Sequence, residues 1–130
     1  MANLTAEQVN GLADNFSAMA QAVGEYRYKN YENLSASQNQ QIKDLQATIL
    51  DIADRLYTLS AVLVMEDIET SLTTIGNITN EIKETYQTLL DFQKAINVAG
   101  AVVTLGSSIL SGKPASIVQS INSLVKIWNA

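Results

Sequence analysis

The feature that most constrains the fold is the stretch at residues 95–110, AINVAGAVVTLGSSIL, which contains no charged side chain. A helix drawn through this stretch is apolar over most of its surface, so it must be buried in protein or in lipid. Gly100, Thr104, Ser108 and Gly112 fall four residues apart, which stacks them into one stripe of small side chains on a helix. Another helix can approach such a stripe closely. We therefore predict that these four residues form an interaction surface.

Apolar residues elsewhere recur at alternating spacings of three and four, the pattern of a and d positions in helices that pack lengthwise. The first such segment begins with a capping box, in which Thr5 and Gln8 satisfy each other's backbone amides. The second contains three clean heptads after a serine cap, either Ser35 or Ser37. The core residues predicted from these and later stripes are Leu12, Phe16, Leu45, Ile49, Ile52, Leu56, Leu59, Leu89 and Ile96.

The sequence allows two positions for the second turn, residues 64–67 or residues 76–79. The apolar stripe shifts by two residues near 64–67, a rotation of about 200° that a turn there would explain. Residues 73–80, TTIGNITN, are poor helix formers with Gly76 and Asn77 at their centre, which favours a turn at 76–79 instead. We predict the second position, with Thr79 or Asn80 capping the next helix.

Gly112 and Pro114 indicate a helix stop followed directly by a helix start. The predicted helices therefore cover residues 5–34, 37–75, 79–111 and 114–129, with no sheet. Together they predict a single all-α domain, residues 1–130, built as an antiparallel helical bundle of about four helices with coiled-coil-like a/d packing.

The composition excludes much common catalytic chemistry. The 130 residues include no Cys and no His, so thiolate chemistry, histidine metal ligands and a Ser–His–Asp relay are impossible. Carboxylates spaced by three occur as Asp51 and Asp54, and again as Glu66–Glu69 and Glu81–Glu84, but we interpret each pair as a solvated helix face. The expectation is a protein that is not an enzyme and binds no cofactor or metal.

Charge also limits the partners. The formal net charge of −5 argues against a nucleic-acid partner, because phosphate binding needs a basic face. The segment YRYKNY, residues 26–31, interleaves aromatic and basic side chains and has two interpretations: a surface that stacks nucleic-acid bases, or the end of a packed helix with tyrosine hydroxyls in solvent. The flanking acids Glu25 and Glu32 favour the second.

The last helix carries one apolar face, which includes Ile117, Ile121, Leu124 and Trp128. The leading hypothesis is a helical interaction or assembly module. In it, residues 95–129 pack a bundle core or mediate self-association or binding to a protein partner. The first residues lack the basic and apolar regions of a secretory signal, so we expect a cytoplasmic protein.

The alternative hypothesis is a membrane-active protein that inserts residues 95–129 as an apolar helical hairpin. This region is similar in composition to the hydrophobic head region of α-helical pore-forming toxins, in which Gly, Ala and Val dominate a helical pair. That resemblance covers about 35 residues and implies a hairpin that leaves the bundle to enter a bilayer.

Overall fold

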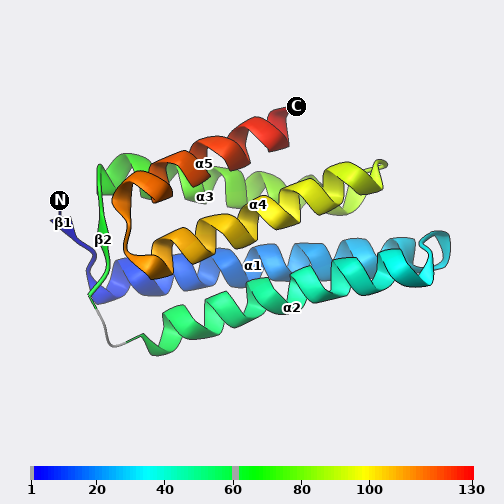
Figure 1. Cartoon of the computed structure of the whole chain (residues 1–130), viewed down its shortest axis with the longest axis horizontal. Helices are drawn as coiled ribbons and strands as arrows, with labels where there is room; N and C mark the ends of the chain where they lie inside the picture. Colours follow the sequence, from blue (N-terminus) through cyan, green and yellow to red (C-terminus); the bar gives the residue numbers. More distant parts are fainter. Residues whose placement is uncertain (1, 60–61) are drawn as a thin grey trace.

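The computed structural model describes residues 2–59 and 62–130. In that part of the chain five α-helices pack together, which confirms the all-α prediction (Figure 1). Two short 3-10 helices, η1 (Tyr31–Asn33) and η2 (Tyr86–Thr88), follow α1 and α3. The α-helices are α1 (Ala6–Asn30), α2 (Ala36–Thr58), α3 (Ile68–Thr85), α4 (Phe92–Ser111) and α5 (Pro114–Asn129).

The helices surround one cluster of buried apolar side chains. Going around the bundle, α3 packs against α1, α1 against α2, α2 against α4, α4 against α5, and α5 against α3. The most extensive contact joins α1 and α2, which lie side by side and run in opposite directions (Figure 1). The largest fully buried side chains include Tyr26, Tyr86, Phe16, Leu12, Met19, Ile42, Ile49 and Leu56.

The first two helix starts follow the predicted capping chemistry. Thr5 and Gln8 form the complete capping box at the start of α1. Ser35 rather than Ser37 caps α2, and its partner is Gln38. Each box satisfies two backbone amides that the first helical turn leaves unpaired.

The second turn lies where the apolar stripe shifts, so the prediction of one helix over residues 37–75 is wrong. Helix α2 ends at Thr58, and α3 begins at Ile68 and continues without a break through residues 76–79. Gly76 and Asn77 are tolerated within α3 because Ile75, Ile78 and Ile82 bury one face of it. Burial of an amphipathic face outweighs the weak intrinsic propensity of two residues.

The predicted helix over residues 79–111 is also divided. Helix α3 ends at Thr85 and α4 begins at Phe92, so Thr79 and Asn80 lie inside a helix and cap nothing. The predicted absence of a sheet is wrong as well, because β1 (Ala2–Asn3) pairs antiparallel with β2 (Val64–Met65). Two-residue strands are too short to show an alternating pattern in sequence.

Five of the nine predicted core residues are buried, namely Leu12, Phe16, Ile49, Ile52 and Leu56. The other four, Leu45, Leu59, Leu89 and Ile96, are partly buried and pack on the outside of the buried cluster. The a/d stripes therefore locate the buried faces of α1 and α2 but include some residues at the margin of the core.

Candidate interaction surface on α4 and α5

Helix α4 has an inner face that packs against α2 and α5. Asp91 precedes its first turn and accepts a hydrogen bond from the Gln93 amide at 3.0 Å, which satisfies one free donor. At the other end Gly112 adopts the left-handed conformation, with φ at 68°, and Pro114 begins α5, as the sequence predicts. The buried residues of the inner face are Ala95, Val98, Ala99, Val102, Leu105, Gly106 and Ile109.

Helix α4 contacts α2 tightly at Gly106, a residue that the stripe of small residues does not include. A Cβ atom added to Gly106 would lie 2.7 Å from Ile52 Cδ1 and 3.2 Å from Phe16 Cε1. Only a residue without a side chain fits this contact. A signal for it exists in the sequence, because Ala95, Ala99 and Gly106 share one helix face at spacings of four and seven.

The four residues of the predicted stripe do not share one neighbour. Ser108 contacts α5, where its hydroxyl and that of Ser120 form a hydrogen bond of 2.8 Å. Gly112 forms the turn between α4 and α5. Thr104 is exposed, and a Cβ atom added to Gly100 would meet no atom within 4 Å. Within the described chain, Gly100 and Thr104 thus lie on an uncovered face.

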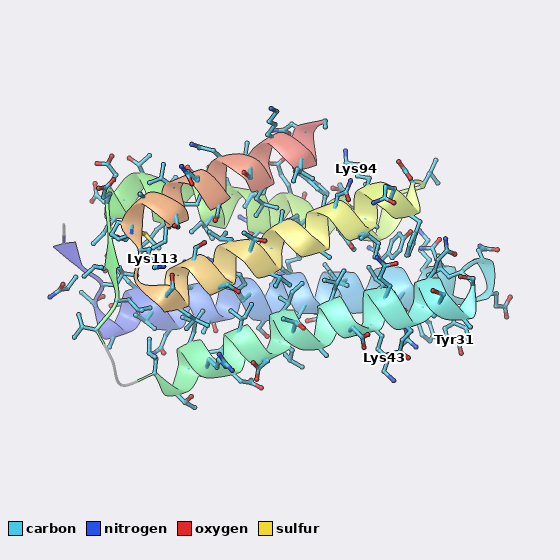
Figure 2. All side chains as sticks on the ribbon, in the orientation of Figure 1. Tyr31, Lys43, Lys94 and Lys113 are labelled. Atoms are coloured by element: carbon cyan, nitrogen blue, oxygen red, sulfur yellow. The ribbon has the colours of Figure 1, made fainter. Side chains whose placement is uncertain are left out.

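That uncovered face, here called the outer face of α4, has no charge over five helical turns. Its residues are exposed or half-buried and occupy one side of the helix. They are Gln93, Asn97, Gly100, Thr104, Ser107 and Ser111. Lys94, the single charged residue of α4, lies beside this face, with its ammonium 5.7 Å from the ring centre of Trp128. Figure 2 shows Lys94 at the start of α4 and Lys113 at the opposite end of the bundle.

The predicted apolar face of α5 is buried. Ile117, Ile121, Leu124 and Trp128 all lie in the core cluster. The Trp128 indole also donates a 3.3 Å hydrogen bond to Glu81 of α3, which fixes the last turn of α5 against that helix. These four residues therefore place the apolar face of α5 in the shared core of the bundle.

A tyrosine pair anchors the start of α4. The rings of Tyr26 and Tyr86 meet edge to face at 5.4 Å between centroids, and the Tyr86 hydroxyl donates to the Ala95 carbonyl at 2.6 Å. Burial raises the pKa of Tyr86 far above its usual value of 10.0, and the neighbouring Tyr26 contributes. Burial also raises the pKa of Tyr26, and the negative charge of Asp91 adds a smaller increase.

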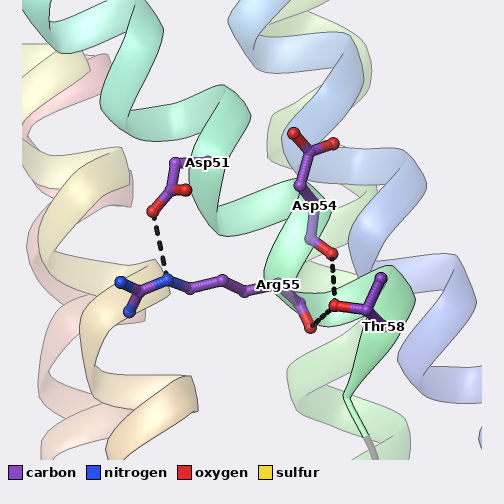
Figure 3. A network of polar contacts seen from close by, with 4 residues as sticks. All are labelled: Asp51, Asp54, Arg55 and Thr58. Atoms are coloured by element: carbon purple, nitrogen blue, oxygen red, sulfur yellow. Dashed lines mark hydrogen bonds and ion pairs between the residues drawn. The ribbon is translucent and has the colours of Figure 1, made fainter.

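The carboxylates of Asp51 and Asp54 do not point at a common position. In Figure 3 the Asp51 carboxylate turns toward Arg55, with a separation of 3.1 Å between oxygen and Nε, while the Asp54 carboxylate lies apart from both. The Asp54 backbone carbonyl instead accepts a hydrogen bond from the Thr58 hydroxyl at 3.0 Å. Among the described residues, no three acidic, histidine or cysteine side chains lie together as metal ligands would.

Within residues 2–59 and 62–130, α4 is the one helix that is long and apolar enough to cross a membrane by length and composition. Half of its most apolar window is buried inside the bundle. No protein-family model matches the chain, and no curated protein or solved structure matches it either.

Proposed function

We propose that the protein is a non-enzymatic helical interaction module that associates with a second copy of itself through the outer face of α4. The observation that carries this proposal is the absence of charge on that face, from Gln93 to Ser111. The exposed faces of α1, α2 and α3 all carry acids. The buried centre of a protein interface is depleted of charged residues, and small residues allow two helix backbones to approach closely.

The geometry at Gly100 supports the same conclusion. Because a Cβ atom there would meet nothing within 4 Å, a neighbouring helix of a second chain has direct access to the backbone. Thr104 directs its hydroxyl back to the Gly100 carbonyl at 3.1 Å, so its polar atom is already paired and its methyl group is free for packing. Coiled-coil-like a/d packing of α1 against α2 is part of this proposal, supported by the buried stripes that these two helices direct at each other.

Multi-angle light scattering over a concentration series tests the proposal. We expect the wild-type mass to rise to a multiple of one chain. Thr104→Glu should return it to one chain, because the new carboxylate would be buried without a partner. The matched control is Thr73→Glu, which adds the same charge at an exposed position of α3 and should leave the mass unchanged. A wild-type chain that remains monomeric at every concentration contradicts the proposal.

A second candidate function, insertion of the α4–α5 hairpin into a membrane, is favoured by the length and apolar composition of α4. Insertion requires α4 to leave α2, and a disulfide can prevent this. A Cβ atom added to Gly106 would lie 2.8 Å from Ile52 Cγ2. The double variant Ile52→Cys with Gly106→Cys therefore brings two sulfur atoms within disulfide range.

Dye release from liposomes by the reduced double variant, and not by its oxidised form, would support insertion. The chain contains no other cysteine, so reduction and oxidation change only this bond. If neither the wild-type protein nor the reduced variant releases dye, the hairpin does not insert.

A further inference from the structure

One end of the bundle carries both the α1–α2 and the α3–α4 connections (Figure 1). Three exposed large hydrophobic side chains lie in or beside these connections. Tyr28 is 88% exposed, Tyr31 is 55% exposed and Leu90 is 100% exposed. We call these three residues the tyrosine end. Figure 2 shows Tyr31 at this end, opposite Lys113. Three of the six exposed large hydrophobic residues of the described chain therefore lie in or beside two neighbouring connections: Tyr28 in the last turn of α1, Tyr31 in η1, and Leu90 between η2 and α4.

Buried contacts join the segments that carry the tyrosine end. The buried contact of Tyr26 with Tyr86 ties the last turns of α1 to η2, and the Tyr86 hydroxyl ties η2 to α4. Gln87 of η2 lines the same open cleft as Tyr28, a cleft of about 650 Å³, so the two connections are adjacent. Nothing in the packing of the bundle requires Tyr28 or Leu90 to be apolar, because their neighbours in sequence supply the buried contacts.

Cationic side chains lie among these exposed side chains. Arg27 and Lys29 line a second open cleft, of about 570 Å³, together with Tyr28, Tyr31, Glu32 and Asn33. The Arg27 guanidinium lies 5.5 Å from the centre of the Tyr31 ring, and its buried Nε atom makes no hydrogen bond within the described part of the chain. Arg27 and Lys29 face Glu32 in this cleft, and Glu25 lines the neighbouring cleft beside the same two cations. The guanidinium of Arg27 and the ammonium of Lys29 are both hydrogen-bond donors that can bind phosphate oxygens.

We propose that the tyrosine end docks on a lipid surface, with Tyr28, Tyr31 and Leu90 entering the headgroup layer and Arg27 and Lys29 contacting phosphate groups. Tyrosine suits this depth because its ring is apolar and its hydroxyl remains hydrated. A protein partner usually needs about 800 Å² of continuous surface on each side, whereas three side chains on two connections provide only a small contact. This docking is peripheral, and it requires neither self-association through α4 nor insertion of the hairpin.

Co-flotation with phosphatidylcholine vesicles, with and without phosphatidylserine, tests the proposal. We expect the wild-type protein to float with the vesicles, and more completely when phosphatidylserine is present. Tyr28→Ser combined with Leu90→Ser should reduce the bound fraction roughly tenfold, because apolar burial supplies much of interfacial binding. The matched control is Leu50→Ser combined with Val62→Ser, which changes two exposed apolar residues elsewhere and should bind like the wild type.

Charge variants separate the two parts of the contact. Arg27→Gln with Lys29→Gln should remove the preference for phosphatidylserine and retain weak binding to phosphatidylcholine. Circular dichroism confirms that each variant folds, and light scattering of the same samples reports self-association independently. Three outcomes would overturn the proposal: no flotation of the wild type, equal losses in the control variant, or binding of soluble glycerophosphoserine as tight as binding of vesicles.

Discussion

Gly106 of α4 lies directly against Ile52 of α2, so close that a methyl group on Gly106 would stand 2.7 Å from Ile52 Cδ1 and 2.8 Å from Ile52 Cγ2. The contact sets how near the α4–α5 hairpin can approach the other helices. Both atoms of Ile52 belong to a buried, β-branched side chain with few alternative rotamers. The neighbour therefore cannot move aside at low cost.

Gly106→Ala should lower the free energy of unfolding by about 1–3 kcal/mol, because overpacking outweighs the gain of about 1 kcal/mol that alanine brings to a helix. Gly11→Ala is the control, since its new methyl group would meet nothing within 4 Å and it should stabilise the protein. Urea denaturation of both variants measures the two effects. Equal stabilisation by both would mean that α4 and α2 lie farther apart than described.

The sequence could predict which faces of α1 and α2 are buried, because repeated a/d positions make a strong periodic signal. It also predicted the Thr5 capping box and the Gly112–Pro114 turn, since each depends on a few adjacent residues. It failed at Gly76 and Asn77, where local propensity indicated a turn and the buried residues of α3 overrode it.

The candidate surface was predictable only in part. Spacing shows that Gly100 and Gly106 lie on different sides of one helix, and it does not show which side receives a neighbour. That choice depends on the fold of α2 against α4, a contact between segments about fifty residues apart. The exposure of Leu90 was equally hidden, because an apolar residue in a predicted helix is normally assigned to the core.

Asp67, which precedes α3, adopts the left-handed backbone conformation, with φ at 43°. Its side chain makes no capping hydrogen bond there. The left-handed region costs a residue with a side chain about 1–2 kcal/mol and costs glycine almost nothing. Comparing Asp67→Gly with Asp67→Ala isolates this cost, because both variants remove the carboxylate.

We expect the free energy of unfolding of the glycine variant to exceed that of the alanine variant by about 1 kcal/mol. This figure already allows for the greater freedom of glycine in the unfolded chain. Thermal and urea denaturation both measure the difference. An alanine variant that is the more stable of the two would show that residue 67 has an ordinary backbone conformation in solution.

Tyr86→Phe should destabilise the protein at neutral pH by about 1 kcal/mol, the usual net value of a buried hydrogen bond. The bond lost is the one from the Tyr86 hydroxyl to the Ala95 carbonyl, at 2.6 Å. Tyr28→Phe is the control at an exposed ring and should change the free energy of unfolding by less than about 0.5 kcal/mol.

Tyr86→Phe should also change how the free energy of unfolding depends on pH above about pH 10. Burial raises the pKa of Tyr86 in the folded chain, so above about pH 10 the unfolded chain loses this proton and the folded chain keeps it. The stability contributed by this group is complete below pH 10 and declines as pH rises above that value. Between pH 10 and 11 the wild type should lose about 1 kcal/mol more than Tyr86→Phe. If the free energy of unfolding falls equally with pH in the wild type and in Tyr86→Phe, the Tyr86 hydroxyl is open to solvent.

The final prediction separates two members of the small-residue stripe, Ser108 and Gly100, which the structure places in different surroundings. Ser108 is hydrogen-bonded to the buried Ser120 of α5, so Ser108→Leu should push α4 and α5 apart and leave the Ser120 hydroxyl without a partner. Such overpacking typically costs about 1–3 kcal/mol. Ser107→Leu is the matched control, because it makes the same change one residue away on the exposed side.

Gly100→Leu should behave in the opposite way in a single chain. Its Cβ position is open, and leucine is a better helix former than glycine by roughly 0.5–0.8 kcal/mol, so the melting temperature should rise. If the outer face of α4 joins two copies, the same leucine should abolish the concentration-dependent increase in mass while the isolated chain stays folded. Differential scanning calorimetry and light scattering on one sample measure both effects. A lower melting temperature with unchanged mass would mean that Gly100 packs against another helix of its own chain.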